Sequence, residues 1–95
     1  MTQELLVIMR DLKPQIKKRF KAREIQLFGS NVRGEQREGS DIDVLVEFEE
    51  GADLFDLVGL ATFLEEQLQR RVDVISKQAL REELRDSILR EAVAV

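Results

Sequence analysis

Three aspartates are the residues of this chain whose type and spacing could do chemistry. Asp41 and Asp43 stand two positions apart, and Asp73 lies within a second apolar segment, 71–75. Carboxylates that converge repel one another unless a cation compensates them, and Mg²⁺ prefers carboxylate, phosphate and water oxygens. The three side chains therefore indicate phosphate chemistry assisted by a divalent ion. Taken singly, Asp41 could cap a turn and Asp73 could be an ordinary exposed strand residue.

Composition restricts the chemistry further. The 95 residues include no cysteine and no histidine, which excludes disulfides, thiol nucleophiles, Cys/His zinc sites and Ser-His-Asp arrangements. A chain of this length with 43% hydrophobic residues predicts one small globular domain, 1–95. No apolar stretch is long enough for a membrane span, and the N-terminus lacks a signal-peptide core. We therefore expect a cytoplasmic protein.

Charge is distributed unevenly along the chain. Residues 1–40 carry nine basic and five acidic groups, whereas 41–95 carry six basic and fourteen acidic groups. An acidic chain without Trp or Tyr lacks the positive potential and stacking surfaces of a general nucleic-acid binder. The basic cluster in 17–23 is interpreted as a solvated helix face, with a nucleic-acid contact as the alternative.

Periodic apolar residues predict the elements that must position the aspartates. Helices are expected over 2–22, from an Asp53 cap to about Gln69, and in a last region capped by Ser76. Pro14 is expected to kink or restart the first helix. Strands are expected over 24–28, 41–48 and 71–75, with a helical turn over 31–33 and an exposed loop over 35–40.

Two apolar stripes are expected to bury the later helices against the sheet. The stripe of the middle helix consists of Leu54, Leu57, Val58, Ala61, Leu64 and Leu68. The stripe of the last helix consists of Leu80, Leu84, Ile88, Leu89 and Ala92. The expected fold is α/β (α+β), a small mixed β-sheet with helices packed on one face.

Alternation within strand 41–48 places Val44 on the core face and Asp41 and Asp43 on the other face. The helix between this strand and strand 71–75 makes the two strands plausible parallel neighbours. Asp73 is then expected beside the other two carboxylates.

A glycine–serine pair, Gly29-Ser30, is separated from Asp41 by ten residues. Asp-x-Asp alone arises often by chance. Asp-x-Asp preceded by Gly-Ser at a fixed distance arises rarely by chance, so the combination points to a functional motif. This pattern resembles the signature of the DNA polymerase β-like nucleotidyltransferase superfamily, and more closely that of the minimal nucleotidyltransferase (MNT) domains. The resemblance extends over nearly the whole chain and departs from the commonest family pattern at Asn31-Val32.

The resemblance implies a role for each residue of the motif. Gly29 lets the backbone approach a phosphate, and the Ser30 hydroxyl can hydrogen-bond its oxygens. Asp41 and Asp43 would share two Mg²⁺ ions, and Asp73 would complete the ligands of the second. Arg33 is a candidate nucleotide-binding residue that could meet the phosphates, although a surface arginine before a glycine turn is an equal alternative.

The function implied by the resemblance is Mg²⁺-dependent transfer of a nucleoside monophosphate, AMP from ATP, to a hydroxyl acceptor. MNT proteins are often paired with HEPN toxins, so the expected acceptor is a tyrosine of such a partner, in a type VII-like toxin–antitoxin system. A chain this short has no room for a second, acceptor-binding domain, which also favours a protein partner.

Two alternatives to this function remain open. One is a non-catalytic module that masks a basic toxin with the acidic 41–95 surface. The other is nucleotidyl transfer to a small molecule or an RNA end, with the acceptor pocket built across a homodimer. The oligomeric state, homodimer or hetero-oligomer, stays open as well.

Overall fold

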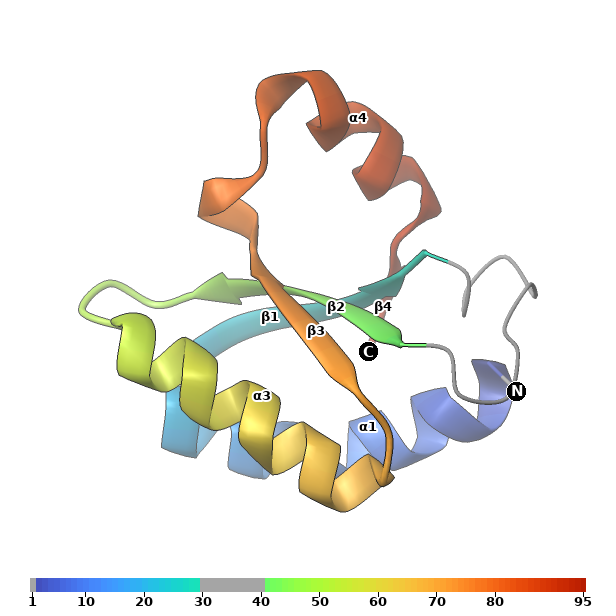
Figure 1. Ribbon diagram of the computed structural model, residues 1–95, viewed down its shortest axis with the longest axis vertical. Helices are drawn as coiled ribbons and strands as arrows, with labels where there is room; N and C mark the ends of the chain where they lie inside the picture. Colours follow the sequence, from blue (N-terminus) through green and yellow to red (C-terminus); the bar gives the residue numbers. More distant parts are fainter. Residues whose placement is uncertain (1, 30–40) are drawn as a thin grey trace.

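The computed structural model describes residues 2–29 and 41–95 (Figure 1). Its elements are α1 (Thr2–Phe20), β1 (Ala22–Phe28), β2 (Ile42–Phe48), α3 (Leu54–Leu68), β3 (Val72–Ser76), the 3-10 helix η1 (Lys77–Ala79), α4 (Glu82–Glu91) and β4 (Val93–Ala94). The strands of this described part form one mixed sheet in the order β3-β2-β1-β4. β2 and β3 are parallel, and β1 is antiparallel to both of its neighbours. The predicted fold class is confirmed.

The centre of the sheet follows the alternation of β2. Ile42, Val44, Val46 and Phe48 are all buried in the main core, as expected from their spacing. Leu45, on the opposite face, is also buried but lies outside that core cluster. Asp43 and Glu47, on the same face as Leu45, are only half-buried, so the two faces of β2 differ in burial and the register is specified by the core face.

Helices α1 and α3 cover one face of the sheet (Figure 1). Phe20 of α1 meets Phe63 of α3 with ring centroids 5.6 Å apart, a favourable tilted aromatic pair. α1 is one continuous helix through Pro14, so the expected restart is wrong. Among the helices of the described residues, none is long and apolar enough to cross a membrane.

The ends of α3 agree with the sequence prediction. Asp53 is the N-cap and forms a capping box with Asp56, in which each carboxylate accepts a hydrogen bond from the other's backbone N–H. Gln69 ends the helix in the left-handed conformation, and its N–H donates to the carbonyl of Glu65 at 2.9 Å.

The apolar stripe of α3 is only partly buried. Leu60, Phe63 and Leu64 are buried, because α3 packs on the sheet and on α1 through this middle part. Leu54 and Val58, expected in the stripe, are 72% and 53% exposed. The prediction is wrong for these two residues, because the first turn of α3 lies beyond the buried part of the helix.

α4 also departs from the expectation. It lies across the sheet from α1 and α3 in Figure 1, so only those two helices share one face as predicted. None of the ten residues of α4, all of them described, is buried. Of its expected stripe, Leu84 is 52% exposed and Leu80, Ile88, Leu89 and Ala92 are half-buried. The predicted buried side is formed incompletely.

Near the C-terminal part, the predicted cap at Ser76 is wrong, and a fourth strand was not predicted. Ser76 does not cap a helix through its side chain: its hydroxyl donates to Oε1 of Gln78 at 2.9 Å. The edge strand β4 pairs Val93 with Leu27 and Ala94 with Gln26 on β1. This pairing brings residues 93–95 to the sheet and covers the edge of β1 from Ile25 to Leu27.

Candidate active site

The parallel pairing of β2 and β3 brings two of the predicted carboxylates together. Asp43 and Asp73 are direct partners in the register of the two strands. Parallel neighbours lie about 4.8 Å apart, so side chains at one register position are adjacent on one face. Val44 and Val74, the next residues along each strand, are buried in the core on the other face. The sheet thus directs both carboxylates away from the core.

Gly29 lies against one member of this pair, Asp43. β1 ends at Phe28, which pairs with Asp43 across the antiparallel ladder. Gly29 follows with φ 79°, a conformation that L side chains rarely adopt. A Cβ at this position would lie 3.2 Å from Cγ of Asp43 and would overlap its Oδ2. Glycine is therefore required here for two reasons, the backbone angle and the contact with Asp43.

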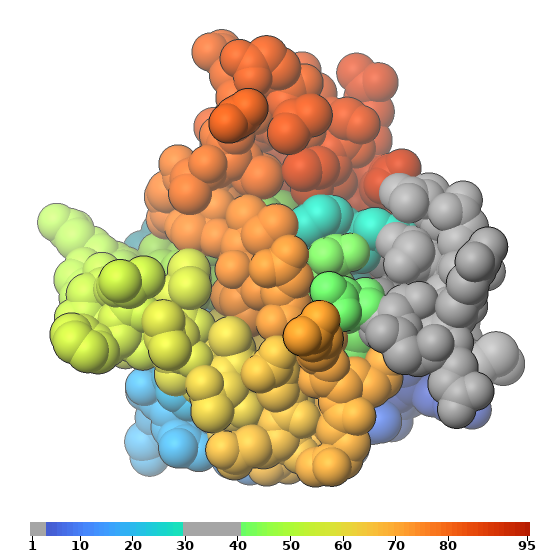
Figure 2. Space-filling model, viewed as in Figure 1, coloured from blue at the N-terminus to red at the C-terminus, as the bar shows by residue number. Residues whose placement is uncertain are grey.

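Asp41 lies just before the start of β2, and its side chain is exposed. Asp43 is half-buried and Asp73 is exposed, so all three carboxylates are reachable from solvent. The backbone N–H of Ile42 donates to the carbonyl of Arg71 at 2.9 Å, which ties the beginning of β2 to the beginning of β3. Figure 2 shows the resulting surface, where the end of β1 (cyan), the beginning of β2 (green) and β3 (orange) meet.

The donor set fits a magnesium ion that is shared with a substrate. Within residues 2–29 and 41–95, no three acidic side chains already form a metal-holding group. Mg²⁺ in nucleotide enzymes is bound by one or two carboxylates together with phosphate oxygens and water, and seldom by a cage made of protein alone. The Asp43–Asp73 pair would supply carboxylates to such a site, whereas Asp41, just before β2, does not form a group of three with them in the described residues.

Two other predicted site residues lie outside the described part of the chain. They are Ser30 and Arg33, and their assignment to the nucleotide phosphates stays a prediction. The expected helical turn over 31–33 and the loop over 35–40 fall in the same unassigned range.

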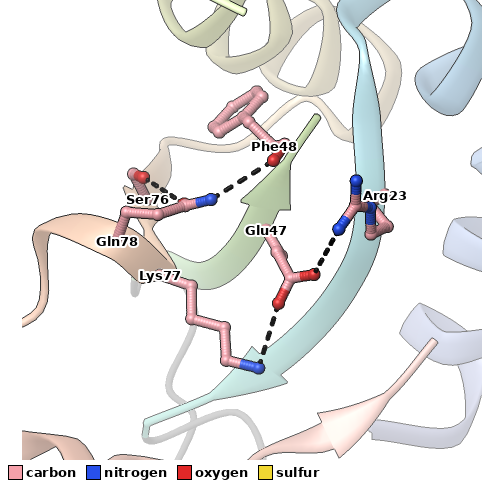
Figure 3. A network of polar contacts seen from close by, with 6 residues as sticks. All are labelled: Arg23, Glu47, Phe48, Ser76, Lys77 and Gln78. Carbon is pink, nitrogen blue, oxygen red and sulfur yellow. Dashed lines mark hydrogen bonds and ion pairs between the residues drawn. The ribbon is translucent and has the colours of Figure 1, made fainter. Parts of the chain in front are cut away.

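A polar network that the sequence analysis did not single out lies farther along β2 (Figure 3). Glu47 contacts Nζ of Lys77 at 3.3 Å and a guanidinium nitrogen of Arg23 at 3.7 Å. Nε2 of Gln78 donates to the carbonyl of Phe48 at 3.2 Å. Alternation along β2 puts Glu47 on the same face as Asp43. This alternation is the sequence feature from which the position of Glu47 could have been predicted. The network fixes η1 against the end of β2.

Comparison with known proteins identifies the family. The family model of the nucleotidyltransferase domain matches residues 9–95. The chain belongs to this family. The nucleotidyltransferase is 42% identical over 93 residues to the protein adenylyltransferase MntA of Thermococcus cleftensis, a match that covers 98% of this chain and 94% of that protein. The resemblance inferred from Gly29-Ser30 and the aspartates is thereby confirmed at the level of the family.

Solved structures agree with this assignment. A minimal nucleotidyltransferase superposes with a TM-score of 0.86 at 42% identity, covering 100% of this chain and 97% of the other. A toxin–antitoxin complex with AMP-PNP contains a chain that matches with a TM-score of 0.70 at 26% identity, covering 98% of this chain and 70% of that one. These comparisons support the expectation that the protein is an enzyme of the nucleotidyltransferase class and that its substrate is a nucleotide.

Proposed function

We propose that this nucleotidyltransferase transfers AMP from ATP to a tyrosine hydroxyl of a partner HEPN toxin and thereby acts as an antitoxin. The observation that carries the proposal is the Asp43–Asp73 pair with Gly29 against Asp43. It occurs in a chain 42% identical, over 98% of its length, to a protein adenylyltransferase. The similar chain in a toxin–antitoxin complex with AMP-PNP supports both the nucleotide and the kind of partner.

Each residue of the candidate site is assigned a role that follows from its position. Gly29 leaves the backbone after β1 without a side chain, so a phosphate can approach it closely. The Ser30 hydroxyl and the guanidinium of Arg33 are assigned to the phosphate oxygens. Asp41, Asp43 and Asp73 would hold two Mg²⁺ ions, which when bound neutralise phosphate charge and lower the pKa of the acceptor hydroxyl.

The reaction needs only positioning and charge compensation from the protein. The acceptor oxygen bonds to the α-phosphorus of ATP while the bond from that phosphorus to the β-phosphate oxygen breaks. Pyrophosphate leaves, and the hydroxyl proton passes to solvent. Because Asp73 is on the edge strand β3, the acceptor side of the site faces outward, where a tyrosine of a second protein can enter. We place this reaction in the cytoplasm, where ATP is available.

The test is incubation of the protein with ATP, Mg²⁺ and the product of the gene adjacent to its own, followed by intact-mass measurement of that partner. We expect the mass of one or more AMP groups on the partner, and none when Asp43→Asn replaces the parent. Chelation of the metal with EDTA should stop the transfer, and added Mg²⁺ should restore it. An unmodified partner in a sample where the two proteins form a complex would refute the proposal.

Neutralisation by masking is the second candidate function, and the same variant separates the two. A single run of the sequence, residues 38–69, contains no lysine or arginine, so part of the surface is suited to a basic partner. If Asp43→Asn abolishes AMP transfer and still neutralises the toxin in growing cells, masking is the function. If neutralisation is lost with transfer while the complex still forms, catalysis is the function.

A further inference from the structure

The first two turns of α3 expose three large apolar side chains to solvent. Leu54, Phe55 and Val58 are 72%, 86% and 53% exposed. Isolated apolar residues on a surface are ordinary, whereas contiguous exposed apolar patches are typical of interaction sites. Phe55 is the most exposed of them, and aromatic side chains of this kind commonly anchor protein interfaces.

A hollow lies directly beside these side chains. It has a volume of about 450 Å³. Its apolar wall includes Phe48, Leu54 and Leu57, and its acidic rim includes Glu49, Glu50 and Asp53. In Figure 2 the yellow-green segment that carries the rim and the start of α3 projects at the left of the molecule. We refer to residues 48–58 as the acidic–apolar surface.

No positive charge from its own segment neutralises this surface. Residues 38–69 contain no lysine or arginine, and α3 has no basic residue in its last turn. Ser76 and Gln78 line the hollow as well, but Lys77 between them directs its amine to Glu47 (Figure 3). Glu49, Glu50 and Asp53 are all exposed. The surface combines carboxylates with apolar side chains.

We infer that the acidic–apolar surface docks a segment of the partner protein that presents aliphatic side chains next to lysine or arginine. Apolar side chains from the partner would cover Phe55 and Val58, and its cations would lie against Glu49 and Glu50. Complementary charge at the rim speeds association and selects the partner, while burial of the apolar centre supplies affinity. The inference rests on the proposed function in taking the acceptor protein as this partner.

The docking surface is separate from the candidate active site. Asp43 is the second residue of β2 and Phe48 is the last, so they lie about 16 Å apart at about 3.3 Å per residue. A partner held at residues 48–58 therefore leaves the Asp43–Asp73 edge open to ATP. Substitutions can therefore alter partner binding without altering the catalytic residues, and the reverse. An experiment can then refute the docking surface without refuting AMP transfer.

The test uses two double variants and two matched controls. Phe55→Ser/Val58→Ser removes the apolar centre, and Glu49→Lys/Glu50→Lys reverses the rim. Val7→Ser is the apolar control, since Val7 on α1 is 57% exposed, and Glu66→Lys is the charge control on the exposed end of α3. Circular dichroism checks that each variant is folded.

Calorimetric titration with the HEPN protein measures the outcome. We expect each double variant to weaken the Kd by at least about tenfold, and each control to stay within about twofold. Salt should weaken binding of the parent and should affect Glu49→Lys/Glu50→Lys much less. An amphipathic Leu/Lys peptide should also bind the parent better than its Leu/Glu counterpart, and only while Phe55 and Val58 are present.

Several results would overturn the inference. One is an unchanged Kd in both double variants, and another is the absence of any complex between the parent and the HEPN protein. A parent that is a dimer by light scattering, and that Phe55→Ser/Val58→Ser converts to a monomer with unchanged partner binding, would assign the surface to a second copy. A parent that binds through this surface but adds no AMP would support docking and refute only the proposed catalysis.

Discussion

Gly29→Ala tests whether the contact between the backbone after β1 and the Asp43 carboxylate is needed for catalysis. The Cβ of alanine would lie 3.2 Å from Cγ of Asp43 and would overlap Oδ2. On its N-terminal side this backbone is held by the pairing of Phe28 with Asp43. We therefore expect the carboxylate to move and to lose its alignment with Asp73.

The magnitude has two separable parts. Holding alanine at φ 79° costs about 1–2 kcal/mol, because the Cβ crowds the backbone in that conformation. For a domain of this size the cost lowers the Tm by roughly 5–15 °C. Displacement of a positioned catalytic group by about 1 Å lowers a rate by about 100-fold. We expect both effects in Gly29→Ala.

Gly51→Ala is the matched control. Gly51 has φ 92°, and an added Cβ would meet nothing within 4 Å. This variant should lose stability to a similar degree and keep the parental rate of AMP transfer at saturating partner, because Gly51 lies in the acidic–apolar surface and not beside Asp43. Thermal unfolding measures the stability of both variants. The rate of AMP transfer is measured at a temperature well below the Tm of either variant. Gly29→Ala with a parental rate, or Gly51→Ala with an equal loss of rate, would refute the reasoning.

Substitutions at four further residues, with controls, test the fold and the site. Leu60→Ala should destabilise the protein by about 2–5 kcal/mol in denaturant titrations, because this side chain is fully buried, whereas exposed Val7→Ala should change stability by less than about 0.5 kcal/mol. Asp53→Ala should cost about 0.5–2 kcal/mol by loss of the capping box, and Asp53→Ser should recover most of the lost Tm. Glu47→Gln should cost under about 1 kcal/mol, with a difference that shrinks in high salt. Asp73→Asn should leave the Tm of the protein nearly unchanged, since Asp73 is exposed, and should abolish AMP transfer; measurable transfer would remove Asp73 from the site.

Much of the fold follows from local patterns in the sequence. The alternation of β2 and the capping signal at Asp53 specify their elements because each depends on near neighbours in the chain. β4 does not follow from such a pattern, since Val93–Ala94 is too short to show a period and is defined only by pairing with β1. Ser76 was misassigned because a nearby side chain, Gln78, takes its hydroxyl.

The site was predictable to the extent that it depends on strand direction. The helical crossover implied that β2 and β3 are parallel, and the register then pairs Asp43 with Asp73. The contact of Gly29 with Asp43 depends on the antiparallel register of β1 and β2, which no local pattern specifies. The exposure of Leu54 was missed for a related reason, because periodicity identifies an apolar stripe without showing how far its partner surface extends.

The register of β2 couples the stability of this protein to its chemistry. Val44 and Val46 are fully buried, and Asp43 between Ile42 and Val44 faces the opposite side. A slip of one residue would move the valines toward solvent and the carboxylate into the core, where an unpaired charge is very costly. The same apolar residues that hold the sheet together therefore keep Asp43 beside Asp73. Substitutions in this core should affect catalysis only through unfolding, whereas Gly29 acts on the carboxylate directly.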